Sequence, residues 1–272
     1  MDAAQQLAKV SESPRLDAEV LLASTLKRPR SYLHAWPERM LELQQAARFT
    51  AWLERCLAGE PVAYLLGCRE FWSLELEVTP DTLIPRPETE LLVELALERL
   101  PANDPVQIAD LGVGSGAIAL ALARERPRAR IVATDRSPAA LAVARRNAQR
   151  LRIANIEFRQ GDWCEALADD RFDLIAANPP YVAATDSCWR EGALRFEPSA
   201  ALVAGVDGLD ALRVIIAQAP DCLKLGGWLV LEHGYDQGET TATLLREQGF
   251  VEISDHQDAA GFPRTVCGRW SG

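Results

Sequence analysis

The spacing of apolar residues along the chain changes near residue 70, which predicts two parts of different kinds. Before that point apolar residues recur at intervals of three and four, as at Leu16, Val20 and Leu21 and again between Met40 and Leu57. This period is typical of amphipathic helices, and prolines interrupt it often enough to keep each helix short. We therefore expect a small helical domain over residues 1–70.

A strictly alternating stretch follows and predicts a different element. From Leu74 to Val78 every second residue is apolar, which is the pattern of a strand with one buried face. We interpret residues 71–85 as a β-hairpin connector. A helix should open at Pro87, because proline suits the first helical position and the nearby glutamates favour the positive end of a helix dipole.

Beyond residue 100, short apolar runs alternate with helical patterns. This alternation predicts an α/β domain with a mostly parallel sheet, which should occupy residues 86–272. The expected strands are 106–111, 130–135, 154–159, 172–177, 227–233, 250–255 and 264–270, and the expected helices are 116–124, 137–152, 209–222 and 237–248.

Composition and charge limit the classes of partner and the cellular compartment that we expect for this protein. The formal net charge of −10 argues against a protein that holds DNA or RNA mainly through its phosphates. Six cysteines without a C-x-x-C pair indicate reduced thiols rather than a zinc site or a disulfide framework. The start of the chain has no secretory pattern, and no apolar run approaches the roughly 18 residues of a spanning helix. We expect a cytoplasmic monomer without a membrane partner or direct nucleic-acid partner.

Three successive predicted strands end in residues that suit a nucleoside. The glycine-rich stretch 112–116 would let the backbone approach a ligand closely. Asp135 ends the next strand and could accept both ribose hydroxyls, and Trp163 follows the third strand and could hold an adenine. The carboxyl ends of neighbouring parallel strands form one crevice, so these positions predict a nucleoside site.

Each of these positions also has a purely structural explanation. The glycines could serve only to turn the chain, Asp135 only to cap the helix that starts at Ser137, and Trp163 only to pack. The spacing of Gly112, Gly114 and Ala117 also satisfies the permissive dinucleotide fingerprint, so the glycines alone leave an NAD-type cofactor open.

The fourth strand, 172–177, is followed directly by Asn178-Pro179-Pro180-Tyr181, and this tetrapeptide indicates which reaction the site could catalyse. Prolines fix φ and have no N–H, so the carbonyls of Asn178 and Pro179 stay free to face a ligand. The Asn178 side-chain oxygen and the Pro179 carbonyl could accept the two N–H groups of a planar amine or amide, while Tyr181 packs against it. The nitrogen lone pair would then face the methyl group of a sulfonium donor, and such positioning contributes up to about 7–11 kcal/mol. We take Asn178, Pro179 and Tyr181 as the catalytic residues, with no metal required.

Other functions are compatible with this tetrapeptide. It could simply end a strand, and an N6-adenine DNA or RNA methyltransferase can use it on an exocyclic amine. Such an enzyme flips its base out and usually carries a basic groove, which the acidic charge disfavours. A protein that senses S-adenosylmethionine without catalysis would not need Asn178.

Six stretches carry a resemblance to a known family: Glu60–Gly67, Leu83–Glu90, Asp110–Gly116, Asn178–Tyr181, Phe196–Pro198 and Gly205–Leu209. Through them the chain resembles the PrmC/HemK family of peptide chain release factor N5-glutamine methyltransferases over nearly its full length. The glycine motif and Asn-Pro-Pro-Tyr are shared widely among S-adenosylmethionine-dependent enzymes. The Ile-Pro-Arg-Pro-Glu-Thr-Glu run is narrower and helps to separate this family from the ribosomal-protein glutamine methyltransferases. Val113 and Val182 depart mildly from the family pattern of threonine and isoleucine.

The resemblance implies a class I S-adenosylmethionine-dependent methyltransferase, with a Rossmann-like, mostly parallel seven-stranded sheet and a small N-terminal helical domain for substrate recognition. It implies S-adenosylmethionine as donor and the glutamine of the Gly-Gly-Gln motif in class I release factors as acceptor, in support of translation termination. Arg86 and Glu88 would act either on the substrate or as a structural clamp. The implied cofactor-binding residues are Gly112, Val113, Gly114, Ser115, Gly116, Asp135, Trp163 and Asn178, and the implied substrate-binding residues are Asn178, Pro179, Pro180 and Tyr181.

Overall fold

The computed structural model describes residues 3–167 and 169–272, which fall into two compact units. The first unit contains the chain up to Cys68 together with the distant segment Arg190–Phe196. The second unit contains Arg69–Trp189 and Glu197–Gly272.

The first unit is helical, as the three-and-four spacing predicts. A small core of Leu7, Leu21, Leu53 and Cys56 holds its helices together. The longest helix is fixed at its start by a capping box, in which the side chains of Glu42 and Gln45 each accept a backbone N–H. The helices are α1 (Ala3–Leu7), α2 (Pro14–Leu26), α3 (Arg30–Ala35), α4 (Leu43–Leu57) and α5 (Val62–Leu66).

A short hairpin of β1 (Cys68–Phe71) and β2 (Leu74–Glu77) follows. Trp72 and Ser73 form its turn with φ of 52° and 56°, which is the left-handed backbone that a tight hairpin requires. The backbone N–H of Trp72 donates to the Glu90 carboxylate at 2.8 Å. This bond ties the hairpin to the first helix of the larger domain.

The second unit is built on a seven-stranded sheet in the order β5-β4-β3-β6-β7-β9-β8, in which only β9 runs antiparallel to its neighbours. The mostly parallel α/β fold predicted from the alternating pattern is therefore confirmed. The strands are β3 (Gln107–Leu111), β4 (Arg130–Asp135), β5 (Ile156–Gln160), β6 (Phe172–Ala177), β7 (Leu223–Glu232), β8 (Phe250–Gln257) and β9 (Pro263–Trp270).

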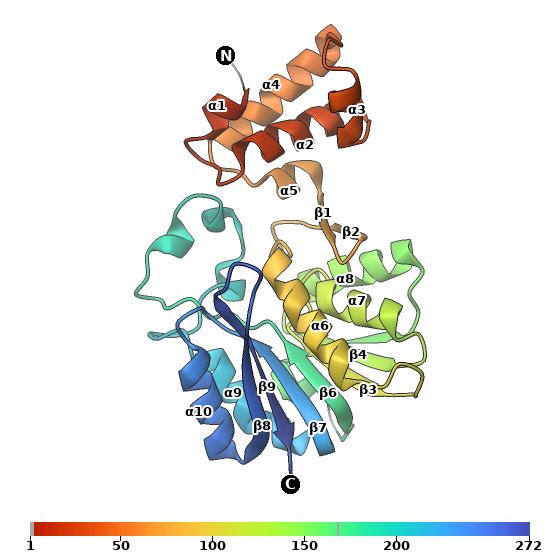
Figure 1. Ribbon diagram of the computed structural model, residues 1–272, viewed down its shortest axis with the longest axis vertical. Coiled ribbons are helices and arrows are strands. Elements are labelled where there is room, and N and C mark those ends of the chain that lie inside the picture. The colour runs from red at the N-terminus through yellow and green to blue at the C-terminus, as the bar shows by residue number, and fades with distance from the viewer. Residues whose placement is uncertain (1–2, 168) are drawn as a thin grey trace. The chain divides into compact units, whose positions relative to one another are not determined.

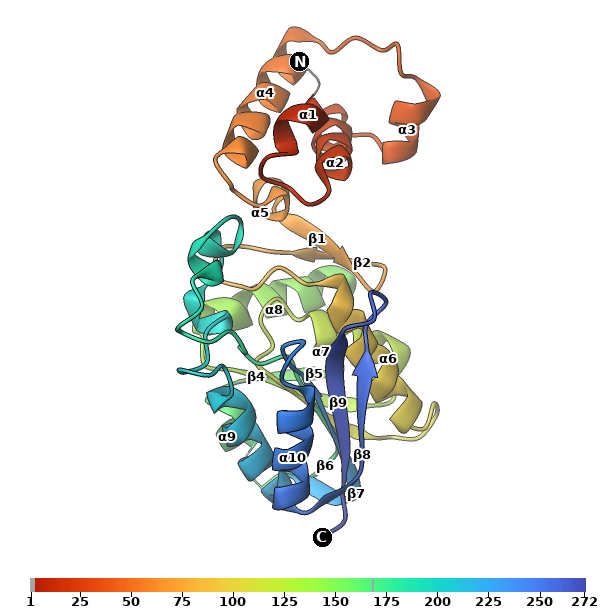
Figure 2. The same ribbon diagram turned by 60° about the vertical axis from the view of Figure 1, so that its left-hand side comes forward.

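Helices cover both faces of this sheet, as Figures 1 and 2 show. On one face α6 (Glu90–Arg99), α7 (Ala117–Glu125) and α8 (Pro138–Leu151) pack against one set of strand residues. On the other face α9 (Asp210–Gln218) and α10 (Gly238–Gln248) pack against the alternate set. Both faces are buried, which explains why the central strands read as continuous apolar runs rather than as alternating ones.

Among the strands and helices of the α/β domain, the largest differences from the predicted bounds are in β7 and α9. The strand expected at 227–233 begins earlier, at Leu223, and runs through the pair Gly226-Gly227. Its pairing with β6 shifts register there, and Gly226 has φ of 81°, so the glycines accommodate a bulge rather than end the strand. The helix expected over 209–222 ends as an α-helix at Gln218 and continues as a 3₁₀ turn over Ala219–Asp221, which contains a proline.

The strand order places the functional crevice. From β3 the chain moves outward through β4 to β5, and then returns to β6 on the other side of β3. Such a switch point opens a crevice at the carboxyl ends of the strands, where ligands bind in open α/β sheets. Among the described residues, no helix is both long and apolar enough to cross a membrane.

Candidate active site

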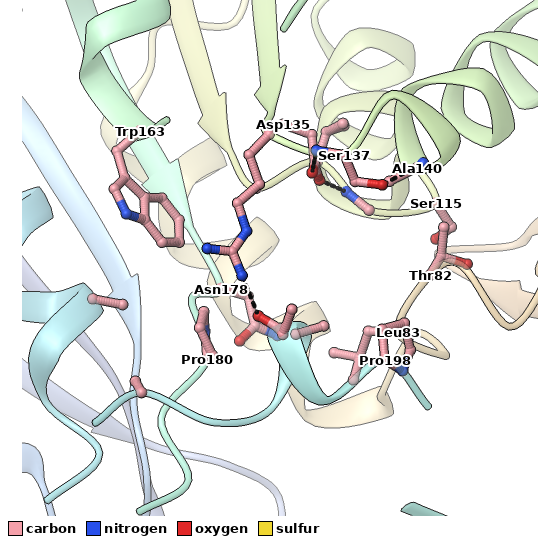
Figure 3. Close-up of a pocket in the computed structure, with 18 of the residues that line it drawn as sticks. Thr82, Leu83, Ser115, Asp135, Ser137, Ala140, Trp163, Asn178, Pro180 and Pro198 are labelled. Atoms are coloured by element: carbon pink, nitrogen blue, oxygen red, sulfur yellow. Dashed lines mark hydrogen bonds between the residues drawn. The ribbon is translucent and has the colours of Figure 1, made fainter. Parts of the chain in front are cut away.

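A cavity of about 450 Å³ lies at this switch point, within the second unit. Figure 3 shows Asp135 and Trp163 above it and Asn178 and Pro180 below it. Its volume falls within the range of small-molecule sites, which is about 300–1,000 Å³. The structure therefore brings residues from four strand ends to one cavity.

The glycine-rich loop between β3 and α7 forms one wall. Gly112 and Gly114 have φ of 76° and 53°, in the left-handed region that favours glycine. A Cβ on Gly112 would lie 3.3 Å from the Trp163 ring, whereas a Cβ on Gly114 would meet no other atom within 4 Å. The loop thus leaves open space on the cavity side, where a ligand can approach the backbone.

Asp135 lies at the end of β4 and lines the cavity. Its carboxylate accepts the backbone N–H of Gly114 at 3.0 Å and that of Ser137 at 2.8 Å. Burial raises the pKa of Asp135, and these two hydrogen bonds oppose the rise. A carboxylate offers about four acceptor sites, so two remain for hydroxyl groups of a ligand. The side chain both shapes the glycine loop and presents oxygen to the cavity.

Trp163 lies against the glycine loop, after β5. It has φ of 42°, which is unusual for a tryptophan, and begins the 3₁₀ turn Trp163–Leu167. The ring lines the cavity beside Gly112. It is therefore placed to cover a planar ligand group that rests on the glycine loop.

Asn178 directly follows β6 and is half-buried in the cavity wall. Its side-chain amide nitrogen donates a hydrogen bond to the hydroxyl of Thr89, with the two atoms 3.1 Å apart. Thr89 is buried, and its hydroxyl donates in turn to the Glu232 carboxylate at 2.7 Å. These contacts occupy the nitrogen end of the Asn178 amide and leave its oxygen for another donor.

Tyr181 reaches the same carboxylate from another direction. Its hydroxyl donates to the second oxygen of Glu232 at 3.3 Å, and its carbonyl accepts from the side chain of Gln237 at 3.0 Å. Burial raises the pKa of Tyr181, so the hydroxyl stays protonated and acts as a donor. The aromatic end of the tetrapeptide is thus anchored to β7 and α10.

The narrow motif that runs from Ile84 to Glu90 contacts the surroundings of the site through Arg86 and Thr89, and the hairpin through Glu90. Arg86 forms an ion pair with Glu197, whose other carboxylate oxygen accepts the Ile84 backbone N–H at 3.0 Å. Thr89 bonds to Asn178, and Glu90 bonds to the hairpin turn. The motif therefore braces the wall of the cavity near the tetrapeptide.

The structure places most of the predicted site residues on the cavity wall. Trp163, Asp135, most of the glycine loop and part of the tetrapeptide line the cavity. Gly116, Pro179 and Tyr181 are not among the residues that line the cavity. Gly116 instead packs against α7 and α8, and Pro179 is buried. The predicted residues that line the cavity are Gly112, Val113, Gly114, Ser115, Asp135, Trp163, Asn178 and Pro180.

Thr89 and Glu232 were not predicted as site residues. They lie 143 positions apart and meet only because α6 and β7 pack together. The one sequence signal was the place of Thr89 within the narrow family motif. Within residues 3–167 and 169–272, no group of three or more histidine, cysteine, aspartate or glutamate side chains could hold a metal ion.

Known proteins match both units. Residues 1–67 match the model of the PrmC N-terminal domain, and residues 89–191 match that of the methyltransferase small domain. Among solved structures, a methyltransferase from Pyrococcus furiosus superposes with a TM-score of 0.57 at 16% identity, over 82% of this chain and 100% of that one. A 16S rRNA N2 G1207 methyltransferase from T. thermophilus also gives 0.57, at 22% identity, over 75% of this chain and 49% of that one. These superpositions establish the fold as that of the class I methyltransferases.

Curated relatives extend the match to nearly the whole chain. A release factor glutamine methyltransferase from Coxiella burnetii is 51% identical over 97% of this chain and 95% of its own length. One from Pseudomonas aeruginosa is 52% identical over 96% of this chain and 94% of its own length. The cavity with its Asn-Pro-Pro-Tyr wall thus lies in a chain that belongs to the release factor glutamine methyltransferase family.

Proposed function

We propose that this enzyme methylates the side-chain amide nitrogen of the glutamine in the Gly-Gly-Gln motif of class I peptide chain release factors. S-adenosylmethionine is the methyl donor. The observation that carries the proposal is Asn178, which stands in the cavity wall with its amide nitrogen engaged by Thr89 and its oxygen free. An oxygen acceptor at that place is what a glutamine amide needs to be held through its own N–H groups.

The residues of the cavity fit this donor. In the proposed arrangement the Asp135 carboxylate accepts the ribose hydroxyls, and the Trp163 ring covers the adenine. The open side of Gly114 gives the rest of the donor close access to the backbone. When bound, S-adenosylmethionine supplies an electrophilic methyl group on a positively charged sulfur.

The tetrapeptide supplies the acceptor half of the site. The side-chain oxygen of Asn178, which lines the cavity, would accept one N–H of the glutamine amide. The carbonyl of Pro179, which is buried next to Asn178 and is not itself among the lining residues, would accept the other N–H once the glutamine is bound. This pair of bonds fixes the plane of the amide and turns the nitrogen lone pair toward the methyl group. A new N–C bond forms as the S–C bond breaks, and the nitrogen then loses one proton to solvent. Orientation is the main contribution, because an amide nitrogen is a weak nucleophile with a delocalised lone pair.

The partners and setting of the enzyme are part of the proposal. The names of the curated relatives support a release factor as the protein substrate. We propose that the helical unit up to Cys68 helps to engage that protein, and that the enzyme acts as a cytoplasmic monomer. The net charge of −10 supports a protein acceptor over a nucleic acid.

Transfer of a labelled methyl group to a purified class I release factor tests this function. We expect label on the factor with an intact Gly-Gly-Gln loop and none above background on a Gln→Ala loop variant. Equal labelling of both proteins would contradict the proposed acceptor. A single-stranded DNA and an RNA of mixed sequence serve as further acceptors, and label on either would favour the nucleic-acid alternative.

A further inference from the structure

We infer that Thr89 and Glu232 are positioning residues that fix which way round the Asn178 amide lies, so that its oxygen faces the acceptor nitrogen. The inference rests on the proposed function, because it assigns these two side chains a part in methyl transfer. Neither residue needs to touch the substrate or the donor for this role.

The direction of each hydrogen bond around Glu232 is fixed by its chemistry. Both oxygens of Glu232 are occupied by hydroxyls, that of Thr89 at 2.7 Å and that of Tyr181 at 3.3 Å. In its ionised form the Glu232 carboxylate can only accept hydrogen bonds, so each hydroxyl must then donate to it. Thr89 has a single hydroxyl proton and gives it to Glu232, so its oxygen can only accept from Asn178.

This direction decides the orientation of the amide. The group of Asn178 that contacts Thr89 at 3.1 Å must be the NH₂ group, because a carbonyl oxygen there would face the lone pairs of the Thr89 hydroxyl. The oxygen therefore points elsewhere, and Asn178 lines the cavity. A glutamine amide nitrogen carries donors, so it binds that oxygen and would be repelled by an NH₂ group.

Burial makes this arrangement rigid. Thr89 is 4% exposed and Glu232 is 1% exposed, so solvent does not compete for their hydrogen bonds.

Protonation of Glu232 would remove this constraint on the Asn178 amide. If the carboxyl group carried a proton, it could donate to Thr89, and the hydroxyl could then donate to Asn178. The amide could turn over and present its NH₂ group to the acceptor. The charge on Glu232 is what holds the oxygen in the productive position.

Substitutions at Thr89 test the inference. Thr89→Val keeps the shape of the side chain but removes the acceptor, so kcat for release factor methylation should fall about 10- to 100-fold. The Kd for S-adenosylmethionine should stay within about twofold, because Thr89 has no proposed contact with the donor. Thr89→Ser retains the hydroxyl and should recover most of the lost kcat. The matched control is Thr243→Val on α10, outside the cavity, which should behave as the wild type.

A wild-type kcat in Thr89→Val, or a loss that Thr89→Ser does not recover, would overturn the inference. The side-chain NH₂ signal of Asn178, identified by its absence in Asn178→Ala, provides a readout that needs no catalysis. Its exchange with solvent should be slow in the wild type and faster in Thr89→Val; equal rates would also overturn the inference. A wild type with this protected signal but without transfer to the release factor would instead contradict the proposed function.

Discussion

At the scale of single residues, the site works by presenting acceptors in fixed places. Asp135 and Asn178 each use part of their hydrogen-bonding capacity on the protein and keep the rest for ligands. The protein contacts hold each side chain in one rotamer, so little side-chain freedom remains to be lost on binding. Sequence reasoning located both residues, because strand ends and short motifs are local features.

Asp135 should matter mainly for the donor. We predict that Asp135→Ala weakens S-adenosylmethionine binding by roughly 1.5–3 kcal/mol, the scale of a hydrogen bond to a charged group. Titration calorimetry measures this directly, with circular dichroism to verify that the variant is folded. An affinity equal to that of the wild type would reject the ribose assignment.

The charge on Glu232 predicts a dependence of activity on pH. Burial raises the pKa of Glu232 to about 7, while bonds from Thr89 and Tyr181 and the charge of Arg264 oppose the rise and Glu88 adds to it. The carboxylate is ionised above this pKa and protonated below it, so kcat should decline as pH falls through about 7.

The matched variant for the pH profile is Glu232→Gln, which has no titrating group at this position. Its kcat should be low and should lack the decline near pH 7 that the wild type shows. A variant that keeps the wild-type profile would assign that decline to another group. Both substrates are supplied at saturating concentrations, so that the measured rate is kcat and does not depend on how tightly the substrates bind.

At the scale of elements, the site depends on packing between segments that are distant in the sequence. The Arg86–Glu197 ion pair joins the start of α6 to the chain after the tetrapeptide. The Glu197 side chain is 0% exposed and that of Arg86 is 33% exposed, so the carboxylate relies on Arg86 for its charge partner. This geometry supports a structural clamp for Arg86, which also lines the cavity, so the stability and the KM of an Arg86 variant distinguish the clamp from a role in substrate binding.

Arg86→Leu should therefore destabilise the fold. The substitution leaves the buried Glu197 carboxylate bonded to the Ile84 backbone N–H but without its charge partner. Removal of one member of a buried ion pair costs about 3–5 kcal/mol. We expect the lower end of that range, because Arg86 is partly exposed and some of the pair's energy is screened. Urea unfolding measures the change; a variant with wild-type stability but a raised KM for the release factor would favour the substrate role instead.

Arg213→Leu is the matched control for this experiment. Arg213 also pairs with a carboxylate, that of Asp207, but both side chains are exposed. Exposed pairs contribute about 0–1 kcal/mol, so this variant should unfold close to the wild type.

The element boundaries show where sequence patterns reach their limit. β3, β4 and β6 lie within one residue of their predicted bounds, because each is a buried apolar run with a clear stop. β7 starts earlier than predicted, because a glycine pair separates its first residues from the apolar run and here accommodates a bulge. Such a bulge depends on the neighbouring strand, which a local pattern does not contain.

At the scale of the whole molecule, two features lay beyond the reach of sequence reasoning. The segment Arg190–Phe196 belongs to the helical unit although it follows β6, and the Arg195 guanidinium donates to the carbonyl of Ala58. The pairing of Thr89 with Glu232 likewise joins residues that no shared pattern links. The fold, the family and the part of the cavity wall at the strand ends followed from local motifs, whereas the rest of the wall and the long-range hydrogen bonds required the tertiary structure.

The most direct test of the account is the position and rate of methyl transfer to a class I release factor with wild-type enzyme and Asn178→Ala. We expect mass spectrometry to find one added methyl group on the side-chain amide of the Gly-Gly-Gln glutamine. We also expect the variant to lose nearly all of its kcat while it still binds S-adenosylmethionine. A methyl group at another residue, or an Asn178→Ala enzyme with wild-type kcat, would contradict the account.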